Sequence, residues 1–321
     1  MAPSFTDPVD PTGSPSQRRP ARLAVGVVGT GRVGTVLAAA LRRVGHRVTA
    51  VSTVSPRSRP RVDQLLPGVE YAAPHDVPAN ADLVLLTVPD DVLPGLVRGM
   101  AEAGVVRAGQ LVAHTSGHHG LGILEPLTRV GALPLALHPV LTFTGTAVDL
   151  ARLTGCSFGV TAPEPYRLIA EALVVEMGGE PVWIPEQHRP LYHAALAHGA
   201  NHLVTLVTSA MDLLRDCGVD HPARMLGPLL GAALDNTLRA GDAALTGPVA
   251  RGDAGTVATH LAELRVHAPD THRAYQAMAR LTTDRALATG RIDPQTAQAL
   301  LTALSGDPAG PAGPAVGEDT R

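Results

Sequence analysis

The stretch LYHAALAHGANHLV, residues 191–204, carries three histidines and an asparagine in one helical pattern. An imidazole can donate or accept a proton near neutral pH, so His193, His198 and His202 are candidates for acid–base chemistry. At ~100° per residue, Asn201 lies ~80° around the helix from His193, and His198 lies ~140° from it. His193 and His198 therefore cannot face the same point. A single helical histidine is more often a packing residue than a catalyst, and both interpretations of His193 stay open.

A metal site on this stretch is the first alternative. His198 and His202 lie one helical turn apart, a spacing that can hold a metal ion. The stretch supplies no Glu, and no third ligand follows at a suitable spacing. We therefore predict no metal site, and a metal-dependent hydrolase is the weakest of the functions considered.

A second chemical signal lies near the N-terminus, in VGVVGTGRVG. Its glycines have the G-x-G-x-x-G spacing between a predicted strand and a predicted helix. Gly29 permits a tight turn, Gly31 lets backbone amides approach a pyrophosphate, and Gly34 allows close packing of helix on strand. The predicted nucleotide-binding loop comprises Gly29, Thr30, Gly31, Arg32, Val33 and Gly34.

The end of the second strand, VTAVSTVSPRSRP, favours NADP over NAD. An acid about 20 residues beyond the glycines would bind the 2'-hydroxyl of NAD, but the first acid after them is Asp63. Hydroxyls and a guanidinium can instead bind a 2'-phosphate, unless SPRSRP is merely an exposed loop. The sequence does not decide between Arg57 and Arg59. The predicted 2'-phosphate residues are Ser52, Thr53, Arg57 and Ser58.

Three further strand ends should border the ligand, because parallel strands present their carboxyl ends at one edge of a sheet. LLTVPDD places Val88 and Pro89 beside the cofactor. HTSG and LALHPVLTFTG place Ser116 and His138 where a hydroxyl and an imidazole can bind a carboxylate or polarise a carbonyl. An ordinary strand-to-loop turn explains HTSG equally well. His114, which precedes the strand end, is expected to pack inside.

The elements that position these residues predict an α/β fold, a Rossmann-type, mostly parallel sheet followed by an all-α C-terminal domain. Apolar runs alternate with helical patterns up to Pro185, which is typical of a parallel sheet covered on both faces. Beyond Pro185 the pattern is helix after helix. The predicted strands are 22–29, 46–52, 81–89, 109–116, 132–139, 156–162 and 180–185, and the predicted helices are 31–44, 91–103, 121–130, 164–177, 188–216, 221–240, 253–266, 269–289 and 293–304.

We predict a nucleotide-binding domain over 21–185 and a helical substrate and dimerisation domain over 186–305. The Pro- and Gly-rich ends, 1–20 and 306–321, are expected to be flexible tails.

Composition narrows the class of partner. The chain has 321 residues, 45% hydrophobic residues and a net charge of -3, with dispersed arginines. This pattern gives no basis for binding nucleic acid or a membrane surface. The N-terminal residues lack the apolar run of a signal peptide, and no later stretch approaches ~18 uninterrupted apolar residues. Cys156 and Cys217 lack the spacing of a disulfide framework. A cytoplasmic protein that acts on a small molecule is the expectation.

GVVGTGRVG, HTSG, LALHPVLTFTG and LYHAALAHGAN together resemble a bacterial family that joins a Rossmann-like domain to a C-terminal helical domain of uncharacterised function. That family is related to the 6-phosphogluconate, 3-hydroxyisobutyrate, pyrroline-5-carboxylate and ketopantoate enzymes. The resemblance covers about residues 21–305 and implies a site made of Ser116, His138, Phe143, His193 and Asn201, with Arg251 as a further anion-binding candidate.

The resemblance also brings out a departure. The related hydroxyacid and ketopantoate enzymes carry a lysine one turn before an asparagine, whereas this chain has Ala197 before Asn201 and no lysine among its 26 basic residues. His193 or His138 is then the available proton donor, with Ser116 and Asn201 holding the substrate.

The resulting expectation is an NADP-dependent oxidoreductase that transfers hydride from NADPH to a small carbonyl or imine compound, such as a 2-oxo acid like ketopantoate. By analogy, it is a homodimer through the helical domain. The alternative, favoured by the missing lysine, is an NADP-binding sensor or scaffold without turnover.

Overall fold

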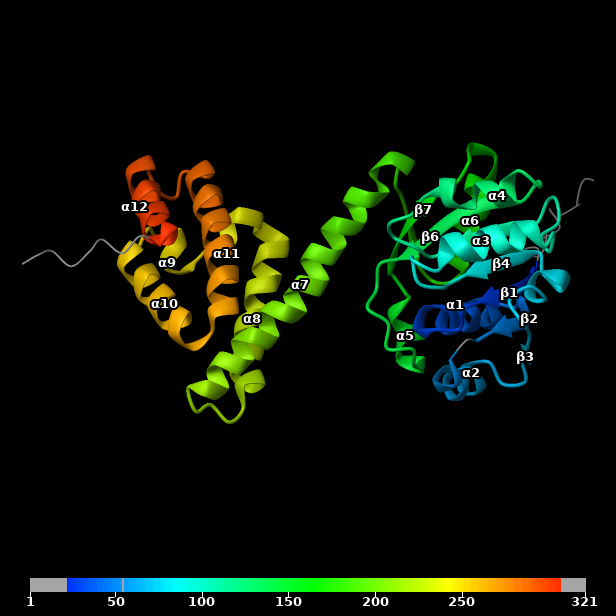
Figure 1. The fold of residues 1–321 in the computed structure, drawn as a ribbon, viewed down its shortest axis with the longest axis horizontal. Coiled ribbons are helices and arrows are strands. Elements are labelled where there is room, and N and C mark those ends of the chain that lie inside the picture. The colour runs from blue at the N-terminus through cyan, green and yellow to red at the C-terminus, as the bar shows by residue number, and fades with distance from the viewer. Residues whose placement is uncertain (1–21, 54, 307–321) are drawn as a thin grey trace, which may run out of the picture. The chain divides into compact units, whose positions relative to one another are not determined.

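The computed structural model describes residues 22–53 and 55–306, so the two predicted tails, apart from Gly306, lie outside the described residues (Figure 1). The chain divides into two compact units between Gly199 and Ala200, inside one long helix. The first unit is α/β and the second is helical, which confirms the predicted fold class. The predicted domain border at 185/186 lies before that helix and stays a prediction.

The first unit contains an eight-stranded sheet of order β3-β2-β1-β4-β5-β6-β7-β8. Every neighbouring pair is parallel except β6 and β7, so β7 and β8 run opposite to the others. The reversal fits a mostly parallel sheet, and it brings the middle of β7 beside His138 on β6. The strands are β1 Ala24–Val28, β2 Arg47–Ser52, β3 Glu70–Tyr71, β4 Leu83–Leu86, β5 Leu111–His114, β6 Leu133–Pro139, β7 Ser157–Thr161 and β8 Glu180–Trp183.

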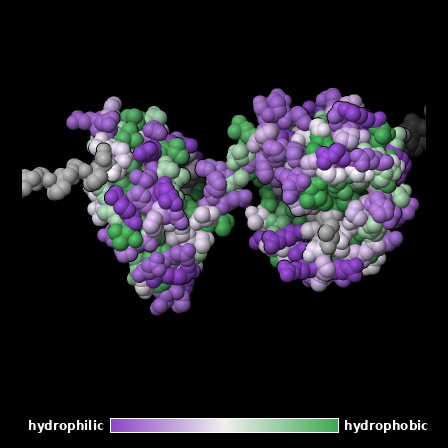
Figure 2. Space-filling view, viewed as in Figure 1, coloured by the Kyte–Doolittle hydropathy of each residue, from purple (hydrophilic) through white to green (hydrophobic). Residues whose placement is uncertain are grey.

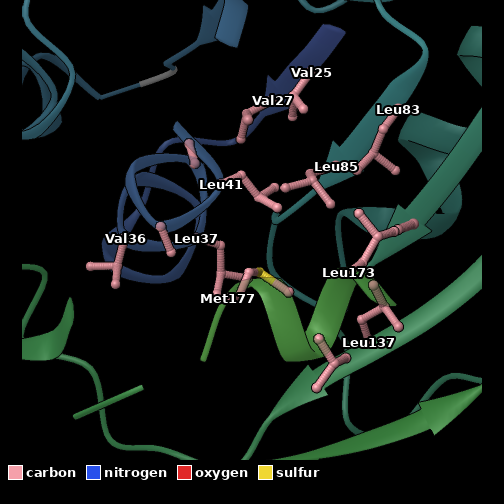
Figure 3. Close-up of a cluster of buried hydrophobic side chains, with 14 of the residues drawn as sticks. Val25, Val27, Val36, Leu37, Leu41, Leu83, Leu85, Leu137, Leu173 and Met177 are labelled. Carbon is pink, nitrogen blue, oxygen red and sulfur yellow. The ribbon is translucent and has the colours of Figure 1, made fainter. Parts of the chain in front are cut away.

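Two apolar layers enclose this sheet, because its central strands bury every side chain in them. Figure 3 shows the larger layer, where side chains of β1, β4 and β6 meet those of α1 and α6. Helices α3 and α4 pack on the other face. The helices of this unit are α1 Arg32–Arg43, α2 Arg59–Leu65, α3 Leu93–Glu102, α4 Glu125–Thr128, α5 Ala147–Arg152 and α6 Arg167–Glu176. Short 3-10 turns are η1 Pro56–Ser58, η2 Val77–Asn80, η3 Leu121–Leu124, η4 Glu164–Tyr166 and η5 Glu186–His188.

The helical unit begins within α7 and has its core among the last four helices. Asp253 and Asp293 cap two of these helices by accepting hydrogen bonds from the amides of Thr256 and Thr296. The long helices before them bury little, and Figure 2 shows apolar side chains among polar ones on the visible face of this unit. Its elements are α7 Arg189–Asp216, α8 Pro222–Ala240, η6 Gly241–Ala244, α9 Gly247–Ala250, α10 Ala254–His267, α11 Pro269–Ala288 and α12 Pro294–Ser305.

Within the described ranges, no helix combines the length and the hydropathy that crossing a bilayer requires.

Candidate functional site

The glycine turn between β1 and α1 has the geometry that its spacing predicts. Gly29 has φ +98°, a conformation that side chains rarely adopt, and its amide and that of Thr30 donate to the Ser52 carbonyl at 3.1 and 3.0 Å. A Cβ on Gly34 would lie 2.5 Å from the Gly29 carbonyl oxygen and would also clash with Thr87. Gly29 and Gly34 are therefore required for the turn and for the close approach of α1 to β4.

Gly31 has a different surrounding, because a Cβ there would meet no atom within 4 Å. It caps the N-terminus of α1 without a side-chain hydrogen bond, and no acid follows in the first turn. The first amides of a helix lack internal partners and favour an anion. An open, side-chain-free helix N-terminus fits the pyrophosphate of a dinucleotide.

The segment predicted to hold the 2'-phosphate divides into buried and exposed parts. Ser52 is buried, and its carbonyl already accepts three hydrogen bonds from Gly29 and Thr30. The Thr53 hydroxyl donates to the Ser55 carbonyl at 3.2 Å. Arg57 and Arg59 are both exposed, and the Arg59 guanidinium also stacks over Tyr71 at 5.1 Å from the ring centroid. Arg57 lacks this contact with Tyr71, and the structure leaves both arginines as candidates for the 2'-phosphate.

A line of contacts runs from this turn along the carboxyl edge of the sheet. Val88 would touch a Cβ on Gly29 at 2.8 Å, so the predicted cofactor residue does border the turn. Two residues further, the Asp90 carbonyl lies 3.3 Å from His119 Nε2, and the His119 amide donates to Ser116 Oγ at 3.0 Å. The glycine turn and the HTSG loop therefore belong to one continuous edge.

Histidines gather at the far end of this line. A Cβ on Gly117 would lie 2.7 Å from His193 Cδ2 and 2.9 Å from His138 Nε2. The His138 and His193 rings are 5.8 Å apart, and the His118 ring lies 6.4 Å from that of His193. His193 lies in the first eleven residues of α7, which belong to the α/β unit. Ser116, His138 and His193, predicted separately, are thus brought together.

Tyr192 is a site residue that the sequence reasoning missed. Its hydroxyl lies 2.8 Å from His138 Nδ1, on the ring edge away from Gly117. Burial raises the pKa of the Tyr192 phenol. Its position directly before His193 in a predicted helix was the available signal, but the pairing depends on the reversed strand β7.

Arg189, the first residue of α7, was also missed. Its side chain is fully buried, with Nη1 donating to Thr161 Oγ1 at 2.9 Å and Nη2 to the Ser116 carbonyl at 2.7 Å. Its Nε has no hydrogen-bond partner, and no ion pair is formed by this arginine within the described ranges. Burial lowers its pKa. A buried positive charge therefore lies behind the Ser116 backbone, where it favours negative charge developing nearby.

The linker before α7 is fixed to the HTSG loop as well. The Glu186 carboxylate accepts hydrogen bonds from the amides of Leu121 and Gly122 at 2.7 and 3.0 Å. A Cβ on Gly120 would collide with that carboxylate. This acid and Arg189 together hold the start of α7 against the carboxyl edge.

The protonation of His138 differs from the expectation. Burial, reinforced by the charge of Arg189, lowers the pKa of His138 to about 4. The ring is therefore neutral at pH 7. We predicted that His138 could donate a proton from its charged form, and the neutral ring cannot do so. Of the two candidates, His193 remains for that role.

His114 packs inside, as predicted. Its ring is fully buried, with Nδ1 accepting from the Ser116 amide at 3.2 Å and Nε2 lying 2.9 Å from the Gly120 carbonyl. A neutral ring protonated on Nε2 satisfies both bonds. Burial lowers the pKa of His114 to about 4, so its role is to hold the HTSG loop in its neutral form.

This burial predicts acid sensitivity. The unfolded ring titrates near ~6.5, so the unfolded state binds more protons between about pH 6.5 and 4. The free energy of unfolding should be constant above about pH 6.5. As the pH is lowered from there to about 4, this ring should reduce it by on the order of 3 kcal/mol. The fluorescence of Trp183, the single tryptophan, reports urea unfolding of the α/β unit at pH 7.5 and pH 4.5. His114→Gln should reduce the difference between the two pH values, and an unchanged difference would refute the assignment.

Other predicted residues are not brought to this cluster. Asn201 is exposed and belongs to the helical unit, as does His202. Phe143 is buried in the core of the α/β unit, and Arg251 ends α9. In the part of the chain that the structure describes, no group of three potential metal ligands occurs.

Comparison with known proteins places the chain. Residues 9–139 match the model of a Rossmann-like domain, and residues 156–282 match that of a domain of unknown function, DUF2520. The chain joins a Rossmann-like domain to a DUF2520 domain. The resemblance stated from the sequence is thereby confirmed.

Relatives of known or assigned activity are similar to this Rossmann-DUF2520 chain. A glycerol-3-phosphate dehydrogenase (NAD(P)+) of Bradyrhizobium sp. is 33% identical over 169 residues, which are 48% of this chain and 50% of that enzyme. The chain thus spans about half the length of the curated relatives it matches. The chain is related to NAD(P)-dependent oxidoreductases.

Solved structures share the fold. A Bacteroides fragilis protein provisionally assigned as an NADP oxidoreductase has a TM-score of 0.70 at 22% identity, covering 81% of this chain and 98% of its own. The pyrroline carboxylate reductase of Plasmodium falciparum, solved with NADP bound, has a TM-score of 0.53 at 13% identity, covering 84% and 98%.

Proposed function

We propose that this protein is an NADP-dependent oxidoreductase that reduces a small carbonyl or imine compound, such as a 2-oxo acid, ketopantoate among them. The observation that carries the proposal is the continuous edge from the open N-terminus of α1 to the histidines around Gly117. The similar Bradyrhizobium dehydrogenase is an NAD(P)+ enzyme, and the Plasmodium falciparum reductase that shares the fold was solved with NADP bound, which supports the cofactor.

The roles follow from the geometry. Bound NADPH would supply the hydride, which adds to the carbonyl carbon as the C=O electron pair moves to oxygen. A proton from His193 then completes the alcohol, while the buried charge of Arg189 favours the negative charge on that oxygen. Ser116 would hold the substrate. Asn201, predicted from the sequence to hold the substrate, is exposed and belongs to the helical unit, and its role stays a prediction.

Two glycine variants separate nucleotide binding from folding. Gly31→Ala should leave the urea midpoint of Trp183 fluorescence unchanged and weaken NADPH binding at least ~10-fold, because the methyl group enters open space at the helix N-terminus. Gly34→Ala is the matched control and should lower the midpoint, because its methyl group meets the Gly29 backbone. Equal NADPH affinity in Gly31→Ala and wild type would contradict the nucleotide site.

The same titration decides the cofactor. Wild type should bind NADPH more tightly than NADH, and Arg57→Ala should reduce the difference. Equal affinities for the two cofactors would refute the assignment of residues 52–58. Binding without loss of NADPH absorbance across a panel of 2-oxo acids and cyclic imines would favour the sensor.

We also propose that a second copy covers α7 and α8. Of the nineteen residues of α8 only Pro222 is buried, and Gly227, Pro228 and Gly231 weaken the isolated helix. Seven large apolar side chains of the helical unit, on α7 and α8, are 39–79% exposed. Burying a large apolar side chain contributes ~1.5–3 kcal/mol, which at ~25 cal/mol per Å² corresponds to roughly 100 Å² of buried surface each. Together the seven side chains approach the ~800 Å² that each partner buries in a stable complex. The seven are Leu203, Val204, Leu206, Met225, Leu229, Leu234 and Leu238.

An apolar groove in the same unit supports a self-complementary interface. It has a volume of about 630 Å³ and lies between α7, α10 and α11, lined by Leu206, Leu213 and Leu264 among others. A twofold dimer brings the same surface of both copies together, so exposed helix faces and the groove can meet in one interface.

Sedimentation velocity tests this dimer. Wild type should sediment as a dimer at micromolar concentration, and Leu238→Asp should shift it to monomer because a charge would be buried at the interface. Leu168→Asp on α6 is the control, since Leu168 is equally exposed, at 79%, in the other unit. A monomeric wild type, or a dimeric Leu238→Asp, would overturn the proposal.

A further inference from the structure

A phenol and an imidazole are paired beside the site, at the point where the sheet reverses direction. His138 on β6 lies opposite Gly159 on the antiparallel strand β7. The absence of a side chain on Gly159 makes room for the ring of Tyr192, which a Cβ there would strike. The Tyr192 hydroxyl reaches His138 Nδ1 at 2.8 Å.

The direction of this hydrogen bond follows from the two partners. The half-buried phenol keeps its proton at neutral pH, because burial raises its pKa, and can donate that proton to an acceptor. The neutral ring of His138 offers one acceptor nitrogen, and Nδ1 is the nitrogen within reach. If Nδ1 accepts, the single ring proton resides on Nε2.

We propose that Tyr192 is a positioning residue that keeps the proton of neutral His138 on Nε2, so that this ring presents an N–H donor to the reducible group of the substrate. The assignment of a substrate rests on the proposed oxidoreductase function. The tautomer itself does not.

The surroundings of Nε2 show where the donor points. A Cβ on Gly117 would lie 2.9 Å from His138 Nε2 and 2.7 Å from His193 Cδ2, so both rings pack closely against the Gly117 backbone. His138 is only partly buried. Among the described residues, Nε2 of His138 is not one of the buried side-chain atoms that lack a hydrogen-bond partner. The neutral donor and the second imidazole therefore meet at Gly117, where the backbone carries no side chain.

This arrangement selects the electronic class of the substrate. A carbonyl oxygen or the nitrogen of a neutral imine has a lone pair that can accept the N–H of His138. A protonated iminium nitrogen has none, and its positive charge is disfavoured near buried Arg189. The geometry therefore favours carbonyl compounds, or imines that enter uncharged, over iminium ions.

Nitrogen NMR of protein labelled in its histidine rings tests the tautomer without substrate or cofactor. His138 is assigned from the signals that disappear in His138→Gln. In wild type, Nε2 should show the shift of a protonated ring nitrogen and Nδ1 that of an unprotonated one. In Tyr192→Phe, which lacks the donor, the signals should move to a mixture of tautomers. A proton on Nδ1 in wild type, or an unchanged ring in Tyr192→Phe, would overturn the proposal.

Kinetics give a second, independent readout. Tyr192→Phe should lower kcat at least ~10-fold with NADPH affinity unchanged, because the wrong tautomer aims a lone pair at the substrate. In His138→Gln the same tyrosine change should have no further effect, since Tyr192 acts through that ring. Gly159→Ala should reproduce Tyr192→Phe by displacing the phenol. Additive losses in the double variant would refute the mechanism, whereas failure to reduce any substrate would count against the oxidoreductase and leave the NMR result standing.

Discussion

His193→Ala is expected to lower turnover at least ~10²-fold while leaving NADPH affinity nearly unchanged. His193 packs against Gly117 together with His138, and the neutral state of His138 leaves His193 to deliver the proton. The loss should appear in kcat, measured as the decrease of NADPH absorbance with saturating substrate. Fluorescence titration of NADPH gives the affinity separately.

His198→Ala is the control for this experiment, because His198 lies on the same helix but ~140° around it. Its turnover should stay within a few-fold of wild type. Asn201→Ala, which removes the proposed substrate-holding amide, should lose at least ~10²-fold as well. A wild-type rate in His193→Ala would exclude this residue as the proton donor.

Arg189→Ala is expected to destabilise the α/β unit by ~3–5 kcal/mol. The substitution removes a fully buried side chain and leaves the Ser116 carbonyl and the Thr161 hydroxyl without the donors they have now. It also releases the start of α7 from the sheet. Urea unfolding followed by Trp183 fluorescence measures the change, because that tryptophan lies on β8 of the same unit.

Arg189→Met is the matched variant, since it keeps most of the volume and removes the buried charge. Its loss of stability should be clearly smaller than that of Arg189→Ala, because both variants remove the buried charge but Met fills most of the cavity that Ala leaves. Equal losses in the two variants would show that the hydrogen bonds, and not the volume, determine the effect.

Much of the fold could be predicted from the sequence because its central strands are buried on both faces. β1 and β4 are apolar at every position except Gly26, and the glycine turn fixes where α1 begins. The structure adds α2, β3 and α5, which the sequence reasoning did not find. α2 buries only Val62, and the start of α5 depends on buried Asp149, whose carboxylate accepts from the amides of Thr144 and Gly145. Neither feature leaves an apolar period.

The candidate site was predictable one strand end at a time, but its assembly was not. The rule for carboxyl ends pointed to Ser116 and His138 without reference to α7. Their meeting with His193 and Tyr192 depends on the direction of β7 and on the burial of Arg189. An apolar run of five residues looks the same in either strand direction, and an arginine at a helix start is ordinarily exposed.

A substitution at Gly117 offers a way to find the natural substrate in living cells. A single methyl group at that position would push against both imidazole rings, while the glycine turn and the apolar layers lie elsewhere. A strain that carries Gly117→Ala on its chromosome should still produce the protein, and the variant should bind its nucleotide but not catalyse the reaction. Comparing the metabolites of such a strain with those of its parent would reveal the natural substrate as the compound that accumulates.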